Sequence, residues 1–280
     1  MSAFAPLSGA RRTSNASDQG FQFVRTRPSF DLVARPAHRG SIVDPIKTLS
    51  TACAAWRPSR IAQTTSDCPR RISPAANTFD RPTDIAWLPD GTYFITDGYG
   101  GKRVVKYDAN DNFIMDWGQA PQDPRNPGPN EWNTVHSIAI SADRRLFVID
   151  RGHARMQVFD ENGKFLDMWS LKSPHWPANQ PTLFVNHFID DKGFIWVGDA
   201  PTSRILKFDL KGNFLYSWGA PGSQPGRLNC SHGITTDQLG NLYLADCFAG
   251  RLQKFEPIAG ADPDKIAGQI LRTWDTWKRP

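Results

Sequence analysis

A unit of about 50 residues recurs four times in this chain, between Asn77 and Trp274. Its most regular column is an aspartate that closes a short hydrophobic strand and recurs after 53, 49 and 47 residues: Asp97, Asp150, Asp199 and Asp246. An arginine follows each aspartate five or six residues later: Arg103, Arg155, Arg204 and Arg251. Each unit then ends on a tryptophan: Trp117, Trp169, Trp218 and Trp274. Repeats of this length built from short strands are typical of β-propeller blades, so we predict an all-β propeller.

Each unit is predicted to contain four strands separated by turns rich in Gly, Asn and Asp. In the first unit the strands are expected at 84–88, 93–96, 103–107 and 113–117, and in the last unit the fourth strand is expected at Ile270–Trp274. The predicted blades span residues 77–118, 131–170, 182–219 and 227–275. Residues 1–76 contain no glutamate, show little periodicity and are rich in Ser, Pro, Ala and Arg. We therefore predict an irregular or disordered basic segment at 1–76.

The distribution of charge argues against a nucleic-acid partner. The net charge of +5 arises from residues 1–76, whereas the remaining 204 residues hold 22 basic and 24 acidic side chains. The repeats therefore lack the basic surface on which phosphate binding depends. No apolar run is long enough to span a membrane, and the first 20 residues lack the apolar core of a secretory signal. The four cysteines have no metal-ligand spacing, so the compartment stays open.

Most of the repeated residues are expected to be structural. An aspartate at a strand end caps the following turn, and the recurrent aromatic residues pack between blades. The column arginines are positioned to pair with the column aspartates. Function is therefore sought where one unit departs from the others.

Two positions break the repeat in a way that suggests a site. Fourteen residues before the closing aspartate the units have Thr83, His136, Val185 and His232. Just after the closing aspartate, Tyr99 stands in the first unit and Arg151 in the second. The start of one strand and the end of the next lie at the same edge of a hairpin, and the first strand of each blade lines the central channel. We therefore expect Tyr99, His136, Arg151 and His232 to meet at one mouth of the channel.

Six short motifs carry a resemblance to a known family: RPTDIA at 81–86, DGY at 97–99, RVVKY at 103–107, WG at 117–118, VHSIA at 135–139 and DR at 150–151. Together they resemble the peptidylamidoglycolate lyases, six-bladed NHL-repeat propellers that complete C-terminal peptide amidation. The resemblance runs from about Asn77 to Phe255 and weakens after residue 169. NHL repeats alone are a common signal, whereas DGY followed by VHS and DR at this spacing is more specific.

The resemblance implies a set of site residues. In the family, three histidines hold a zinc ion on the axis, a tyrosine is the general base, and arginines bind the substrate carboxylate. Position by position, the tyrosine falls on Tyr99, the second and third zinc histidines on His136 and His232, and one arginine on Arg151. The family's fifth blade carries no ligand, which agrees with Val185. The four units then correspond to the last four of six blades.

The chain departs from the family pattern at several positions. The first zinc histidine and a further arginine belong to the two blades that precede these units, and residues 1–76 contain no matching motif. The one upstream histidine, His38, lacks strand context. Gly233 replaces an aspartate that helps to bind calcium in the family, which argues against a calcium site, and Cys230 replaces a methionine. Two imidazoles are fewer than the three protein ligands of an open tetrahedral zinc.

Three hypotheses follow from these residues. The first is a zinc-dependent lyase that cleaves peptidyl-α-hydroxyglycine to a peptide amide and glyoxylate. The second is a non-catalytic propeller that binds a peptide, small molecule or protein at the channel face. The third is a truncated, inactive remnant whose incomplete ring exposes sheet edges. The sequence leaves the true substrate and the oligomeric state open.

Overall fold

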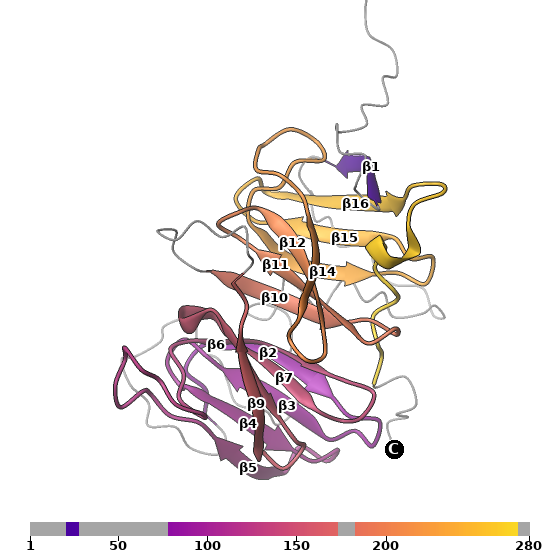
Figure 1. Ribbon diagram of the computed structural model, residues 1–280. Coiled ribbons are helices and arrows are strands. Elements are labelled where there is room, and N and C mark those ends of the chain that lie inside the picture. Colours follow the sequence, from indigo (N-terminus) through magenta and orange to yellow (C-terminus); the bar gives the residue numbers. More distant parts are fainter. Residues whose placement is uncertain (1–20, 28–77, 173–182, 274–280) are drawn as a thin grey trace, which may run out of the picture.

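The structure, a computed structural model, describes residues 21–27, 78–172 and 183–273. Within these ranges the chain is almost entirely β-strand, with single-turn 3-10 helices at Arg151–His153 and Pro263–Lys265. The strands form four antiparallel sheets of four strands each (Figure 1). These sheets are the four predicted blades, so the all-β propeller class is confirmed and the molecule is a partial NHL-type propeller.

The strands of each blade are given from the innermost to the outermost. Blade 1 has β2 (Pro82–Trp87), β3 (Tyr93–Asp97), β4 (Arg103–Tyr107) and β5 (Phe113–Trp117). Blade 2 has β6 (Val135–Ile140), β7 (Leu146–Asp150), β8 (Arg155–Phe159) and β9 (Phe165–Ser170). Blade 3 has β10 (Phe184–Ile189), β11 (Phe194–Asp199), β12 (Arg204–Asp209) and β13 (Phe214–Trp218). Blade 4 has β14 (Ser231–Thr236), β15 (Leu242–Asp246), β16 (Arg251–Pro257) and β1 (Phe21–Arg27).

The outermost strand of blade 4 comes from the N-terminal part of the chain. β1 pairs antiparallel with β16 at the edge of the sheet (Figure 1). The prediction of Ile270–Trp274 as this strand was wrong, because Ile270 instead forms an isolated bridge with Asp190 of blade 3. Trp274 lies outside the described residues. A strand far away in the sequence thus completes the sheet, and residues 21–27 of the segment predicted to be irregular or disordered are a β-strand.

The hydrophobic core lies between neighbouring blades. β2, β6, β10 and β14 lie next to one another in chain order, and buried side chains fill the space between successive sheets. Trp117 of blade 1 contacts Phe159 of blade 2, and Trp218 of blade 3 contacts Phe255 of blade 4. The predicted blade-to-blade packing of the repeated aromatic residues is confirmed for these columns. Truncating one such buried aromatic side chain to alanine typically costs about 3–5 kcal/mol.

The predicted pairing of column aspartates and arginines holds in three blades. Nε of the arginine lies 3.3 Å from the aspartate in blade 1, 3.1 Å in blade 2 and 3.0 Å in blade 4. In blade 3 the guanidinium of Arg204 instead donates to Ser217 Oγ at 3.4 Å. These ion pairs are buried and tie the end of each second strand to the start of the third.

The C-terminal part of the described chain crosses the end of the channel opposite to the predicted site. Leu271 N donates to Ile189 O at the end of β10, and Gly268 N donates to Asp190 Oδ2. Thr273 Oγ1 reaches Trp87 O of blade 1. This segment therefore links blades 3 and 1 across the ring. Among the described residues, none of the helices is long and apolar enough to cross a membrane.

Candidate functional site

The predicted site residues lie on irregularities of the blade hairpins. In every blade the register between the first two strands shifts around one residue near the start of the inner strand: Thr83, His136, Val185 and His232. A bulge adds a residue to one strand and redirects its side chain, and bulges are common beside active sites. The position at which the units differ in sequence is therefore also the position that forms a β-bulge in every blade.

The structure brings all four predicted residues together. Arg151 Nη1 donates to Tyr99 Oη at 2.9 Å, and Tyr99 Oη lies 3.3 Å from His136 Nε2. The rings of His136 and His232 have centroids 5.3 Å apart. These residues come from blades 1, 2 and 4. The expected convergence at one mouth of the channel is therefore observed.

The hydrogen bonds of His136 determine its tautomer. Nδ1 lies 2.5 Å from the carbonyl oxygen of Val185. A carbonyl can only accept, so Nδ1 carries the proton and Nε2 keeps its lone pair. Burial, followed by the charge of Arg151 and by His232, lowers the pKa of His136 to about 3. The imidazole is therefore neutral near pH 7 and presents Nε2 toward Tyr99.

His232 is more exposed than His136 and lies nearer to solvent. Partial burial and the charge of Arg151 lower the pKa of His232 as well. Two neutral imidazoles thus face each other across the mouth, in the protonation state that metal coordination requires.

Two arginines flank the ring of Tyr99. The guanidinium carbon of Arg151 lies 4.8 Å from the ring centroid, and that of Arg81 lies 5.7 Å from it. Tyr99 itself is 39% exposed, so the phenol is open to a ligand. An anionic group that enters the mouth would meet Arg151 first, because the carboxylate partner of Arg81, Asp80, already lies 3.2 Å from its Nε.

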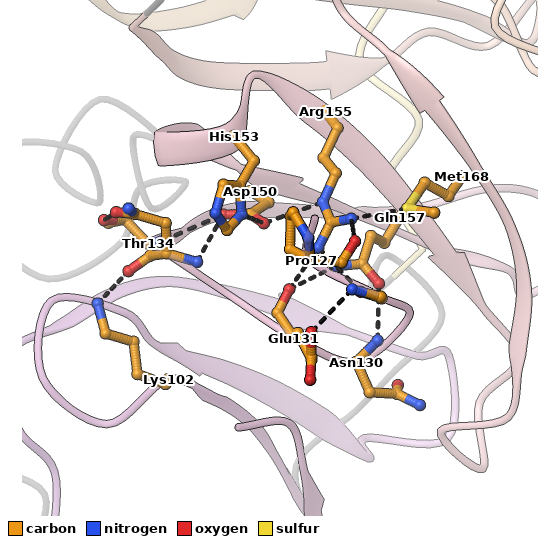
Figure 2. A network of polar contacts seen from close by, with 12 residues as sticks. Lys102, Pro127, Asn130, Glu131, Thr134, Asp150, His153, Arg155, Gln157 and Met168 are labelled. Atoms are coloured by element: carbon orange, nitrogen blue, oxygen red, sulfur yellow. Dashed lines mark hydrogen bonds and ion pairs between the residues drawn. The ribbon is translucent and has the colours of Figure 1, made fainter. Parts of the chain in front are cut away.

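The closing aspartate of blade 2 holds the segment that leads to His136. Asp150 Oδ1 accepts from the backbone N–H groups of Asn133 at 3.0 Å and Thr134 at 3.2 Å. Its Oδ2 accepts from His153 Nδ1 at 2.6 Å and from Arg155 Nε at 3.1 Å (Figure 2). The side chain is fully buried. Four donors on one carboxylate thus hold the backbone just before β6 against the residues that follow β7.

Arg155 extends this network to the connector that precedes β6. Its guanidinium donates to the carbonyl oxygens of Pro127, Gly128 and Glu131 (Figure 2). Lys102 of blade 1 reaches the carbonyl oxygen of Asn133 from the other side. The approach to His136 is therefore anchored by side chains from two blades, which gives the histidine a defined position.

The residues fit zinc in chemical type but not in number. His136 has the tautomer of a zinc ligand, with Nδ1–H bound to a carbonyl as an outer-shell partner. Yet within 78–172 and 183–273 no three His, Cys, Asp or Glu side chains are grouped so that they could hold a metal ion. Cys230 directs its sulfur to Cys247 at 2.8 Å. His38 lies outside the described residues. The site as described supplies two imidazoles, against the three protein ligands of an open zinc site.

A buried polar relay beneath the mouth was not found from the sequence. Ser137 Oγ donates to Asp84 Oδ2 at 2.9 Å and accepts from His187 Nδ1 at 2.9 Å. Burial raises the pKa of Asp84 to about 6 and lowers that of His187 to about 3. The relay joins β2, β6 and β10; Asp84 and Ser137 lie one residue beyond their bulges, and His187 lies two beyond Val185. Its sequence signal was weak, because the three side chains come from three different blades and meet only through the bulges near the starts of their strands.

Comparisons with known proteins bear on this site. No protein-family model matches the chain. Peptidyl-glycine alpha-amidating monooxygenase B of Xenopus laevis is 27% identical over 190 residues, which cover 64% of this chain and 21% of that protein. The resemblance to the amidating enzymes is confirmed. Peptidyl-alpha-hydroxyglycine alpha-amidating lyase 1 of Drosophila melanogaster is 31% identical over 99 residues, which cover 31% of this chain and 17% of that lyase.

A further relative is NHL repeat-containing protein 3 of Mus musculus, which is 35% identical over 94 residues, covering 32% of this chain and 26% of that protein. Among solved structures, virginiamycin B lyase from Staphylococcus aureus is similar with a TM-score of 0.49 at 14% identity, covering 66% of this chain and 57% of that one. At this level the likeness carries no information about activity. The chain spans about a fifth of the length of the first amidating monooxygenase, 21%, so the activity of the whole relative does not transfer with it.

Proposed function

We propose that this NHL propeller, which is related to the peptidylglycine amidating enzymes, binds and cleaves peptidyl-α-hydroxyglycine at the channel mouth. The observation that carries the proposal is the continuous contact from Arg151 through Tyr99 Oη to His136 Nε2. The proposal is supported because a guanidinium, a phenol and an unprotonated imidazole nitrogen lie in contact with one another there. These are the groups that the reaction requires.

Arg151 would orient the substrate by its carboxylate. A guanidinium offers two parallel donors to a carboxylate, which fixes its plane as well as its position. With the carboxylate held there, the neighbouring carbon and its hydroxyl lie toward Tyr99. Positioning of this kind accounts for a large part of catalysis in reactions where one bond breaks within a single bound molecule.

Tyr99 would act as the general base. In its ionised form, the phenolate oxygen would take the proton from the substrate hydroxyl while the carbon–oxygen bond becomes a carbonyl and the carbon–nitrogen bond breaks. The same proton then passes to the departing nitrogen, so the products are a peptide amide and glyoxylate. If zinc is bound, it supplies Lewis-acid polarisation of the hydroxyl, and His136 and His232 would hold it.

The activity is tested with purified full chain loaded with zinc and a peptide that ends in α-hydroxyglycine. We expect release of glyoxylate, which falls by about 100-fold or more in Tyr99→Phe, the size of a lost acid–base group. Arg151→Lys is expected to raise KM because the second parallel donor is lost. Tyr216→Phe on the outer strand β13 is the matched control and should retain wild-type turnover. Wild-type protein without turnover, or equal turnover in Tyr99→Phe, rejects the proposal.

Zinc binding is tested independently of turnover. We expect stoichiometric zinc after dialysis, lost in His136→Ala and retained in His153→Gln, a histidine whose Nδ1 pairs with Asp150 instead. Metal content is measured by elemental analysis. Zinc that survives His136→Ala contradicts the assignment of this ligand.

A second candidate is a propeller that binds a carboxylate ligand without cleaving it. The specific observation in its favour is the ligand count, since the described residues bring two imidazoles rather than three to the mouth. In that case an α-hydroxyglycine peptide would bind, Arg151→Lys would weaken its binding, and glyoxylate would not form. Calorimetry with the peptide beside the turnover assay separates the two functions.

A further inference from the structure

Two cysteines flank the inner hairpin of blade 4 at the same mouth as the candidate site. Cys230 immediately precedes β14 and Cys247 immediately follows β15. The ladder pairs Ser231 with Asp246, and the backbone continues this pairing outward, because Cys247 N donates to Cys230 O at 3.0 Å. The two cysteines are therefore directly opposite each other, one step beyond the last rung of the sheet.

The sulfur atoms are close to bonding distance. Cys247 Sγ lies 2.8 Å from Cys230 Sγ, within about 1 Å of the disulfide bond length of about 2.05 Å. Residues directly opposite each other in an antiparallel pair have Cα atoms about 4.5–5.5 Å apart. That spacing falls within the range of about 4.4–6.8 Å that disulfides occupy. The backbone therefore holds the two thiols ready for a bond without rearrangement of the sheet.

The two thiols differ in accessibility. Cys247 is exposed, whereas Cys230 is 3% exposed and packs with Val185 and Ala200 of blade 3. Val185 is also the residue whose carbonyl oxygen binds His136 Nδ1. An external reagent would thus reach Cys247 first and Cys230 only through it. The pair also lies against the residue that orients one of the site histidines.

We propose that Cys230 and Cys247 form a reversible redox site, in which Cys247 is the attacking cysteine and Cys230 the resolving one. The oxidant is a low-molecular-weight disulfide, RSSR. The thiolate of Cys247 attacks one sulfur of RSSR, and a first RS⁻ leaves and is protonated to RSH. The thiolate of Cys230 then attacks Sγ of Cys247 in this mixed disulfide, and a second RSH leaves. The protein loses two protons and two electrons, which reduce one RSSR to two RSH.

The disulfide would close the mouth end of the blade-4 hairpin. It would tie the start of β14, which carries His232, to the end of β15, next to the exposed Phe248. A bond across a hairpin of this size constrains the unfolded chain, so oxidation is expected to raise the melting temperature by on the order of 5 °C.

The experiment treats the reduced full chain with oxidised glutathione and follows it by intact mass and by non-reducing peptide mapping. In wild type we expect loss of two hydrogens and a peptide that joins Cys230 to Cys247, both reversed by dithiothreitol. In Cys230→Ala the resolving thiol is absent, so a glutathione adduct should accumulate on Cys247. In Cys247→Ala neither product should form on Cys230.

Three outcomes would overturn the proposal. They are a wild-type adduct on Cys247 that persists without resolution, a disulfide that joins either cysteine to Cys53 or Cys68, and equal adduct levels in wild type and Cys230→Ala. The variants are checked for a native melting transition, and Cys230→Ser provides a second substitution at the buried position. All readouts are masses and melting temperatures, so they stand whether or not the chain cleaves α-hydroxyglycine peptides.

Discussion

Blades 2 and 3 have the same inner hairpin with the same bulge, but blade 2 presents polar side chains at the channel mouth and blade 3 presents apolar ones. In blade 2 the bulged residue is His136 and the residue after the closing aspartate is Arg151. In blade 3 the same two positions hold Val185 and Ala200, which are buried in an apolar cluster. Blade 3 still serves the site, because its backbone carbonyl orients the blade-2 histidine. The repeat determines where a side chain lies, and the residue at each position determines whether it is a polar group at the mouth or packs in the apolar cluster.

The closing aspartates of these blades differ in the same way. Asp150 accepts from four donors. Among the described residues, Asp199 accepts from the hydroxyl of Thr202, and its buried Oδ1 has no hydrogen-bond partner there. Burial raises the pKa of Asp199 to about 6. The same residue in the same column therefore has four donors in blade 2, whereas in blade 3 burial disfavours its charged form.

The largest difference is expected on removing these aspartates. Asp150→Ala leaves Arg155 and two backbone N–H groups without their acceptor. This substitution should lower the unfolding free energy by about 3–5 kcal/mol. Asp199→Ala should cost less than about 1 kcal/mol, since it removes a carboxylate whose charged form is disfavoured by burial at pH 7. Urea unfolding at pH 7 measures both. Equal losses would mean that the two carboxylates make the same contribution after all.

The next largest effect is a pH dependence of the unfolding free energy that arises from His187 in blade 3. His187 has its pKa lowered to about 3 by burial, against about 6.5 in the unfolded chain. Between pH 3 and pH 6.5 the unfolded state therefore binds more protons than the folded state. The stabilisation contributed by neutral His187 is present above pH 6.5 and is lost as the pH falls toward 3. The loss attributable to His187 is about 2 kcal/mol between pH 6.5 and 5.

His187→Gln should lack this component, and the measurement is the difference between wild-type and variant unfolding free energies across pH 5–7. The difference is needed because the raised pKa values of Asp84 and Asp199 act in the opposite direction. Those groups bind protons more readily in the folded state, so they add stability as the pH falls from 6 toward 4. Parallel curves for wild type and His187→Gln would contradict the assignment.

A smaller effect is expected in the relay that joins blades 1, 2 and 3. Ser137→Ala leaves Asp84 and His187 without their shared partner and should cost about 1–3 kcal/mol. Ser231→Ala in blade 4 is the matched control, because Ser231 Oγ is equally buried but has no partner in the described chain. Its cost should be within about 0.5 kcal/mol of zero. Both are measured by thermal unfolding, and a reversed order would show that the relay adds no stability.

The smallest effect is expected at the arginine of blade 3. Within the described residues Arg204 makes one hydrogen bond, of 3.4 Å, to Ser217, whereas Arg155 of blade 2 holds Asp150 and three carbonyl oxygens. Arg204→Met should change the unfolding free energy by no more than about 0.5 kcal/mol, the usual range for a surface contact. Arg155→Met, measured beside it by urea unfolding, should be clearly destabilising. A loss in Arg204→Met that matches Arg155→Met would show that the two blades use this column alike.

Much of the fold could be read from the sequence because it is repetitive and local. Successive strands of a blade pair with their neighbours in the chain, so the columns from Asp97 to Asp246 predict strand ends well. The convergence of Tyr99, His136, Arg151 and His232 could also be predicted, since hairpin topology places those positions at one edge. The catalytic and metal-binding roles of these residues remain predictions.

What the sequence determined by itself is the blade pattern and the residues that depart from it. The tertiary structure alone decided the pairing of β1 with β16, the bulge at His136 and the tautomer of its ring. It also decided the approach of Cys230 to Cys247. The physical reason is the distance along the chain between the groups that interact. Sequence periodicity indicates contacts within one hairpin. The proton on an imidazole, the partner of an edge strand and the distance between two sulfur atoms depend on groups that meet only after the blades have packed.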